Sequence, residues 1–317
     1  MPPVADHRPV LVIAGPTAAG KTAVSLALAA RLRIEVVCAD ARQVYRHLDI
    51  GTAKPTPDEQ RVCPHHCIDL LEPSEPYNAA DYARDAAKAI AGIAPDVLPV
   101  LVGGSGLYID ALLDGLSETV IATDPDVRAH MHERFEREGR EALYRELSII
   151  DPRAAARYTD MNPRRVLRAL EYHRMTGMPF SSTWDAPRTP GPYEPHRIVV
   201  TQPRPILYER INHRCDLMWE AGLVQETERV LALGIPPTAQ ALHTVGYTEA
   251  LAVLHGEMDA ATALERMKQS TRNYAKRQLT WFGRDRRYRW YEGDPAGIAE
   301  KIITDTAYEM LIRSYTG

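Results

Sequence analysis

The sequence predicts an α/β protein in which a parallel sheet is flanked by helices and a small helical domain is inserted into the chain. Short apolar, β-rich runs alternate with helical patterns over the first 116 residues, and charged amphipathic patterns replace them up to about residue 190. A length of 317 residues suits a main domain with a smaller insertion. We therefore expect a first part of the core at 1–116, a helical insertion at 117–190, and a return to the core at 191–317.

Four apolar runs are the predicted strands of the sheet. "VLVIAG" from Val10, "IEVVCAD" ending at Asp40 and "VLPVLVGGSG" are typical of buried parallel strands. An alanine-rich helix, expected from about Ala79 to Ile93, precedes the third run. After a Pro/Gly-rich stretch, the β-branched run "RIVVTQ" is assigned back to the sheet.

Helical patterns dominate the remaining chain. Asp124 followed by Pro125 is typical of a helix start and opens the predicted insertion. Beyond "RIVVTQ" we expect long helices from roughly Ile206 to Leu233 and from Ala261 to Phe282.

Composition predicts a soluble cytoplasmic protein. The chain begins without a signal-like segment, no apolar run approaches 18 residues, and four cysteines are too few for a disulfide framework. We expect a monomer without a membrane partner. The net charge is −4, yet one short stretch has seven basic residues against the single acid Asp285. This candidate anion-binding face consists of Arg272, Lys276, Arg277, Arg284, Arg286, Arg287 and Arg289.

The segment "GPTAAGKT" has the G-x-x-x-x-G-K-T pattern of a phosphate-binding loop, between a predicted strand and a predicted helix. This predicts a core like that of P-loop NTPases. Backbone N–H groups and the helix N-terminus would bind phosphate oxygens, Lys21 would pair with a terminal phosphate, and the Thr22 hydroxyl would ligate Mg²⁺. The candidate diphosphate-binding residues are Gly15, Pro16, Thr17, Ala18, Ala19, Gly20, Lys21 and Thr22.

The sequence around this loop favours a substrate diphosphate over a nucleotide that is hydrolysed as fuel. A triphosphatase normally has an acidic residue at the end of another central strand, but "VLPVLV" ends in "GGSG". The suitable carboxylate is Asp40, and no guanine-reading N-K-x-D tetrapeptide occurs.

Several further segments resemble the tRNA dimethylallyltransferase family, in the same order and over nearly the whole chain. They are "GPTAAGKT", "DARQVYRHLDIGTAKP", "PHHCIDL", "GGSGLYIDALLDGL", "GYTEAL" and "TRNYAKRQLTWF". The resemblance implies transfer of a dimethylallyl group from dimethylallyl diphosphate to N6 of the adenosine 3′ to the anticodon (A37). It also implies that the insertion helps to clasp the anticodon stem-loop of tRNA.

The resemblance implies roles for single residues. Asp40 would accept the N6 proton, a task that suits a carboxylate at a strand end, although an Asp there could also cap a turn or hold Mg²⁺ through water. Lys21 and Arg214 would stabilise the leaving diphosphate, with Thr17 and Ser105 as hydroxyls facing the substrates. The family usually has Ser where this chain has Ala41. The tRNA-binding candidates are Asp40, Ala41, Arg42, Gln43, Ser105, Arg128, Arg164, Arg165, Arg168, Gly246, Tyr247, Arg272, Lys276 and Arg277.

Three other activities remain open on the sequence: an adenylate isopentenyltransferase acting on free nucleotides, a P-loop kinase of small metabolites, and a non-catalytic nucleotide switch. The basic face and the insertion argue against the first. The "CPHHC" segment (63–67) packs four potential ligands too closely for tetrahedral zinc, so we expect no zinc site there.

Overall fold

The computed structural model describes residues 7–116, 124–313 and 315. The chain divides into two compact units. The first comprises the described residues of Met1–Leu113 and Gly191–Gly317, and the second those of Asp114–Pro190. No helix in the described ranges is long and apolar enough to cross a membrane.

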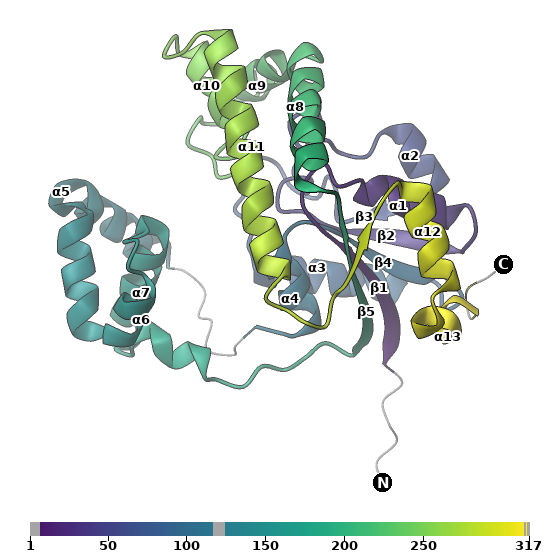
Figure 1. Ribbon diagram of the computed structural model, residues 1–317. Helices are drawn as coiled ribbons and strands as arrows, with labels where there is room; N and C mark the ends of the chain where they lie inside the picture. The colour runs from purple at the N-terminus through teal and green to yellow at the C-terminus, as the bar shows by residue number, and fades with distance from the viewer. Residues whose placement is uncertain (1–6, 117–123, 314, 316–317) are drawn as a thin grey trace. The chain divides into compact units, whose positions relative to one another are not determined.

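A six-stranded sheet forms the centre of the first unit, in the order β3-β2-β4-β1-β5-β6, and all its pairings are parallel (Figure 1). The strands are β1 (Arg8–Ala14), β2 (Ile34–Ala39), β3 (His65–His66), β4 (Leu98–Gly103), β5 (Tyr193–Thr201) and β6 (Arg289–Glu292). The predicted α/β class is confirmed, and the β-branched run returns to the sheet as β5 beside β1. Strand β6 was not anticipated, because its sequence, "RWYE", is half charged and carries no apolar run.

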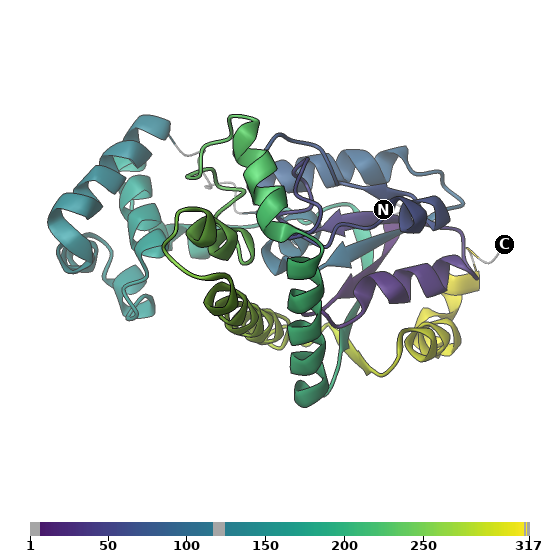
Figure 2. The ribbon, with the colours of Figure 1, turned by 90° about the horizontal axis from the view of Figure 1, so that it is seen from above.

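Helices cover both faces of the sheet, as Figure 2 shows from above. Helices α1 (Lys21–Ala29) and α12 (Pro295–Thr304) pack against each other, as do α3 (Ala79–Gly92) and α4 (Gly106–Leu113). The short helices α2 (Pro57–Val62) and α13 (Glu309–Arg313) complete these layers. Strands buried on both faces explain why β1 and β4 are almost entirely apolar.

Four helices form a group beyond the carboxyl ends of the strands (Figure 1). They are α8 (Arg204–Glu220), α9 (Leu223–Ala232), α10 (Tyr247–Leu254) and α11 (Ala260–Phe282). The expectation of one helix from Ile206 to Leu233 is wrong, because the chain breaks at Gly222, whose φ of 96° is left-handed. Helix α11 matches its predicted span within one residue.

The second unit is helical and has a core of its own. It contains α5 (Pro125–Ile150), which has a kink at Gly139, α6 (Pro152–Arg157), α7 (Pro163–Thr176) and a 3-10 helix (Phe180–Trp184). Asp124 caps α5 by accepting from the N–H groups of Asp126 and Val127, as its position before Pro125 predicts. Its core residues include Met131, Leu143, Leu147, Val166 and Leu170.

Candidate active site

The loop from Gly15 to Thr22 connects β1 to α1, the arrangement that its sequence predicts. Gly15 has a φ of 148°, and a Cβ there would lie 2.2 Å from the carbonyl oxygen of Val200, so only glycine fits. The N–H groups of Lys21 and Thr22 belong to the first turn of α1, where no intrahelical acceptor exists. The loop therefore presents main-chain donors together with the positive end of a helix dipole.

One loop N–H group is already engaged by a distant helix. Gln278 of α11 accepts from the N–H of Thr17 at 2.9 Å and donates to the carbonyl of Gly104 at 3.0 Å. A Cβ on Gly104 would lie 2.1 Å from the Gln278 amide nitrogen, so Gln278 packs tightly against the end of β4. Gln278 thus ties the phosphate loop to the neighbouring strand.

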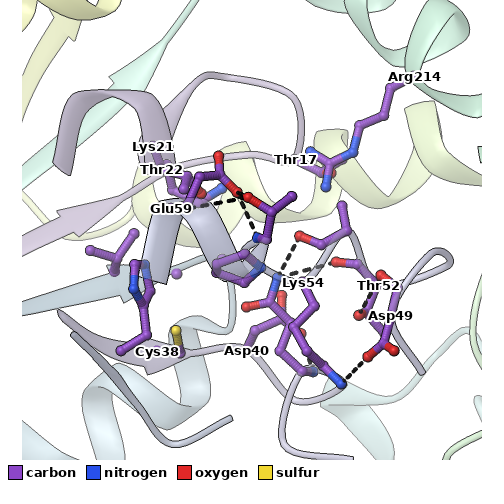
Figure 3. A pocket seen from close by; sticks show the side chains of 18 of the residues that line it. Thr17, Lys21, Thr22, Cys38, Asp40, Asp49, Thr52, Lys54, Glu59 and Arg214 are labelled. Carbon is purple, nitrogen blue, oxygen red and sulfur yellow. Dashed lines mark hydrogen bonds and ion pairs between the residues drawn. The ribbon is translucent and has the colours of Figure 1, made fainter. Parts of the chain in front are cut away.

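A pocket of about 840 Å³ extends from this loop to the end of β2. Its lining includes Lys21 and Thr22 from α1, Asp40 from the end of β2, and Arg214 from α8, seen together in Figure 3. The side chains of Val36, Cys38 and Val102 supply apolar lining from β2 and β4. The pocket thus combines cationic, acidic and apolar surface within the first unit.

Two cations of this pocket are destabilised by burial. Burial, followed by the Arg214 charge, lowers the pKa of Lys21 to about 8, although the Asp40 charge opposes both effects. Burial also lowers the pKa of Arg214, again opposed by Asp40. The Lys21 amine donates to the carbonyl oxygen of Pro16 at 2.8 Å. A bound polyanion would favour the charged form of both groups, so their arrangement suits a diphosphate.

Asp40 follows β2 directly and is half-buried. Its Oδ1 accepts from the N–H of Arg42 at 2.8 Å and from the N–H of Gln43 at 3.4 Å. Within the described residues, Oδ2 accepts no hydrogen bond. The carboxylate therefore caps the turn that follows β2 and keeps one oxygen for another partner. Capping this turn is thus compatible with the predicted role of proton acceptor.

Ser105 positions the turn after Asp40 rather than lining the pocket itself. Its hydroxyl oxygen accepts from the N–H of Ala41 at 3.1 Å, and its own N–H donates to the carbonyl of Ala39 at 3.1 Å. Burial, followed by the Asp40 charge, raises the pKa of Tyr274 to about 12, so this pocket-lining phenol stays protonated at neutral pH. Ala41 takes part through its main chain, which the absent serine hydroxyl does not affect.

The arginine and lysine candidates for tRNA binding on the first unit fall into two groups: exposed side chains, and side chains that already donate hydrogen bonds within the protein. Lys276 and Arg277 are exposed, with the Arg277 guanidinium 5.6 Å from the centre of the Tyr274 ring. Arg272 is bound to Asn212 at 2.5 Å and to Gln269 at 2.8 Å. Arg42 donates to the carbonyl of Gln240 at 2.9 Å.

Gly246 and Tyr247 correct the list of tRNA contacts. The side chain of Tyr247 has no exposed surface and donates its hydroxyl to the Glu226 carboxylate at 2.5 Å. Gly246 is buried, its N–H donates to Glu249 at 2.8 Å, and its carbonyl accepts from Ala250. Both positions serve packing at the start of α10, so the expectation that they contact RNA is wrong.

On the second unit, Arg128, Arg164 and Arg165 are exposed. Arg165 lies 3.6 Å from Asp160 and Arg168 lies 3.6 Å from Glu171. Weak, solvated pairs such as Arg165 with Asp160 leave a guanidinium available to a phosphate. These arginines remain predictions as tRNA contacts.

Polar residues on the inward face of α11 and in the loop at 49–54 also line the pocket, although the sequence pattern did not predict them as site residues. Tyr274 and Gln278 are four residues apart, so both line the pocket from one helical face, a spacing that the sequence contains. Lys54, whose side chain is 4% exposed, also lines the pocket, and its amine is 2.5 Å from both Asp49 and Asp69. Nothing local in "GTAKP" indicates these partners.

The "CPHHC" segment enters the core and the sheet. Cys63 and Cys67 are buried, His66 lies 2.6 Å from Glu35, and His65 lines the pocket. Burial lowers the pKa of His65, which favours its neutral form. Across the described ranges, no three His, Cys, Asp or Glu side chains are grouped to hold a metal ion.

Comparisons with known proteins agree over nearly the whole chain. The family model "IPP transferase" matches residues 43–286, and the model "Isopentenyl transferase" matches residues 8–65. The tRNA dimethylallyltransferase 1 of Trichlorobacter lovleyi is 45% identical over 89% of this chain and 92% of its own length. The tRNA dimethylallyltransferase of Myxococcus xanthus is 46% identical over 88% of this chain and 91% of its own.

Solved structures show the same likeness. The tRNA isopentenylpyrophosphate transferase of Bacillus halodurans is 37% identical, with a TM-score of 0.70 over 97% of this chain and 96% of that one. A eukaryotic dimethylallyltransferase described as acting on tRNA is 26% identical, with a TM-score of 0.75 over 96% of this chain and 78% of that one. From the family model and these full-length relatives, the chain belongs to the IPP transferase family, that of the tRNA dimethylallyltransferases.

Proposed function

We propose that this protein transfers the dimethylallyl group of dimethylallyl diphosphate to N6 of A37 in tRNA. The observation that carries the proposal is one pocket in which the Asp40 carboxylate lies among the same lining residues as Lys21 and Arg214. A carboxylate that can accept a proton at one end and two cations at the other match a reaction that releases a proton and a diphosphate. The relatives named as tRNA dimethylallyltransferases support tRNA as the acceptor over a free nucleotide.

The chemistry divides between the two ends of the pocket. The N6 lone pair forms a bond to C1 of the dimethylallyl group while the C1–O bond breaks. The electron pair of the C1–O bond leaves with the diphosphate. The N6 lone pair is delocalised into the ring and is therefore a weak nucleophile. The N6 proton must be removed as the new N–C bond forms, and Asp40 accepts that proton. Lys21, Arg214 and the loop N–H groups stabilise the charge on the departing diphosphate.

Magnesium fits the donor set at the diphosphate end. The Thr22 hydroxyl in the first turn of α1 makes no hydrogen bond to the described residues, and Glu59 of α2 adds a carboxylate to the same pocket lining. Hard oxygen ligands of this kind suit Mg²⁺. We propose that Thr22 holds the ion, which when bound would neutralise charge on the diphosphate.

The anticodon stem-loop is the proposed RNA element. Exposed Lys276 and Arg277 lie on α11, the helix whose Tyr274 and Gln278 line the pocket, so phosphate contacts there would bring a loop base to Asp40. Extraction of a loop adenosine costs less than opening a base pair. One chain suffices in this proposal, because Asp40, Lys21 and Arg214 belong to one compact unit. Four free, buried cysteines support a cytoplasmic setting.

The test is mass analysis of nucleosides from tRNA treated with the purified protein, dimethylallyl diphosphate and Mg²⁺ without ATP. We expect N6-dimethylallyladenosine at position 37, and none in a matched tRNA with guanosine there. Equal or better prenylation of adenosine monophosphate would favour the free-nucleotide enzyme. A requirement for ATP hydrolysis would favour the kinase alternative and contradict the proposal.

A further inference from the structure

Glu226 of α9 is a buried carboxylate outside the pocket, with 4% of its surface exposed. Its two oxygens accept from the main-chain N–H groups of Asp49, Ile50 and Gly51, at 2.9 to 3.1 Å. They also accept from the Tyr247 hydroxyl at 2.5 Å. Burial, reinforced by the Glu226 charge, raises the pKa of Tyr247, which keeps this phenol a donor. A buried charge is tolerated when four donors satisfy it in this way.

The three N–H groups belong to a segment that forms one wall of the pocket. Asp49, Ile50, Thr52, Ala53 and Lys54 all line it. Between them, Gly51 packs directly on α9 and α10. A Cβ at Gly51 would lie 2.5 Å from the Tyr247 ring and 2.8 Å from Leu223, so the segment has no room to move inward. Glu226 therefore fixes the position of residues 49–54.

Residues 49–54 are bonded in turn to the Asp40 turn. The side-chain amide of Gln43 donates to the carbonyls of Thr52 and Ala53, both at 3.1 Å. The main-chain N–H of Gln43 donates to Oδ1 of Asp40 at 3.4 Å. Lys54 adds a second connection by donating to the carbonyl of Tyr45 at 2.9 Å. Hydrogen bonds, together with the main chain of residues 49–53 and of Gln43, thus connect Glu226 to the carboxylate of Asp40.

We propose that Glu226 is a positioning residue for Asp40, acting through residues 49–54 and Gln43. The inference rests on the proposed role of Asp40 as proton acceptor. Glutamine at 226 would offer one acceptor oxygen and two unwanted N–H donors to a site with four donors, so the segment would shift. A small displacement of Asp40 lowers the chemical rate without removing any group that touches the substrates.

The experiment is a double-mutant cycle on single-turnover prenyl transfer, with tRNA and dimethylallyl diphosphate both saturating. We expect Glu226→Gln to lower the rate about tenfold in the wild-type background. In the Asp40→Asn background it should lower the rate less than about twofold, because the acceptor that Glu226 positions is already lost. Affinity for dimethylallyl diphosphate should stay within about twofold, since no hydrogen bond or ion pair among the described residues joins the phosphate loop to this segment.

The outcomes separate the inference from the proposed function. A wild-type rate for Asp40→Asn would overturn the assignment of Asp40 as proton acceptor, and this inference with it. A strong Asp40→Asn defect combined with a full tenfold effect of Glu226→Gln in both backgrounds would overturn the inference alone. A wild-type rate for Glu226→Gln would also overturn it.

Two further variants control for folding. Glu249→Gln changes another carboxylate that is 4% exposed, on α10, which bonds the N–H of Gly246 and not residues 49–54. We expect its rate within about twofold of wild type. Tyr247→Phe removes one of the four bonds and keeps the ring against Gly51. If Glu226→Gln is insoluble, a threefold loss for Tyr247→Phe that vanishes in the Asp40→Asn background supports the inference, and an unchanged rate overturns it.

Discussion

The two ends of the pocket are built in different ways. Eight consecutive residues, 15–22, form most of the phosphate end, to which α8 adds Arg214 and α11 adds one bond between Gln278 and the N–H of Thr17. The acceptor end combines the turn after Asp40 with Ser105, Tyr274 and residues 49–54, which are far apart in the chain. Most main-chain donors of the loop follow from its own backbone, whereas the turn that Asp40 caps is held by the side chains of Ser105 and Gln43. The geometry of the acceptor end is therefore expected to be more sensitive to distant substitutions than that of the phosphate end.

The largest expected effect breaks the acceptor end itself. Asp40→Asn keeps an oxygen for the N–H groups of Arg42 and Gln43, so the turn survives, but the proton acceptor is lost. We expect single-turnover prenyl transfer to fall about a hundredfold or more, with tRNA affinity nearly unchanged. Asp96→Asn, which alters an exposed aspartate paired with Arg33, is the matched control. A wild-type rate for Asp40→Asn would show that another group takes the proton.

The next effect breaks the phosphate end. Arg214→Gln removes a half-buried charge that lines the pocket. Loss of a charge-assisted hydrogen bond to the diphosphate corresponds to a loss of about ten- to a hundredfold in kcat/KM for dimethylallyl diphosphate. Affinity for tRNA should not change. Arg229→Gln, on the exposed side of α9, is the control. If Arg214→Gln weakened tRNA binding and spared the diphosphate, the two ends would have been assigned the wrong way round.

A pH profile sharpens the comparison further. The pKa of Lys21 is lowered to about 8, so free enzyme loses this charge as pH rises above that value. We expect kcat/KM for dimethylallyl diphosphate to fall above about pH 8, by about tenfold at one unit higher. Bound diphosphate raises the Lys21 pKa, so the limb in kcat should lie at higher pH. Lys21→Arg should abolish the limb, since arginine stays charged; a limb that persists would come from another group.

The smallest expected effect concerns the basic residues of α11. Lys276→Ala with Arg277→Ala should flatten the salt dependence of tRNA affinity by up to about one log-log unit per lost phosphate contact. The chemical rate at saturating tRNA should not change. Arg272→Ala should alter the slope less, because Asn212 and Gln269 already hold that guanidinium. Arg31→Ala, which alters an exposed arginine paired with Glu300 outside this face, is the control. An unchanged slope for the double variant would leave this face as ordinary solvated surface.

The sequence by itself determined the features that depend on neighbours along the chain. Gly15 and Gly20 with Lys21 predict the phosphate loop, the apolar run before Asp40 predicts a strand that ends there, and Asp124 with Pro125 predicts the start of α5. Each follows from backbone geometry within a few residues. The same kind of reasoning failed at the break before α9, where Gly222 ends a helix within a continuous apolar pattern.

Only the tertiary structure decided which side chains are available and which are already bonded. Tyr247 looks like an RNA contact in the sequence, yet it is buried against Glu226, and the Arg272 guanidinium is already hydrogen-bonded to Asn212 on α8 and Gln269 on its own helix. The connection from Glu226 to Asp40 crosses 186 residues of sequence through Gly51 and Gln43. Local pattern fixes backbone conformation, but the partners of a polar side chain depend on which distant segments fold against it, and that depends on the packing of the whole unit.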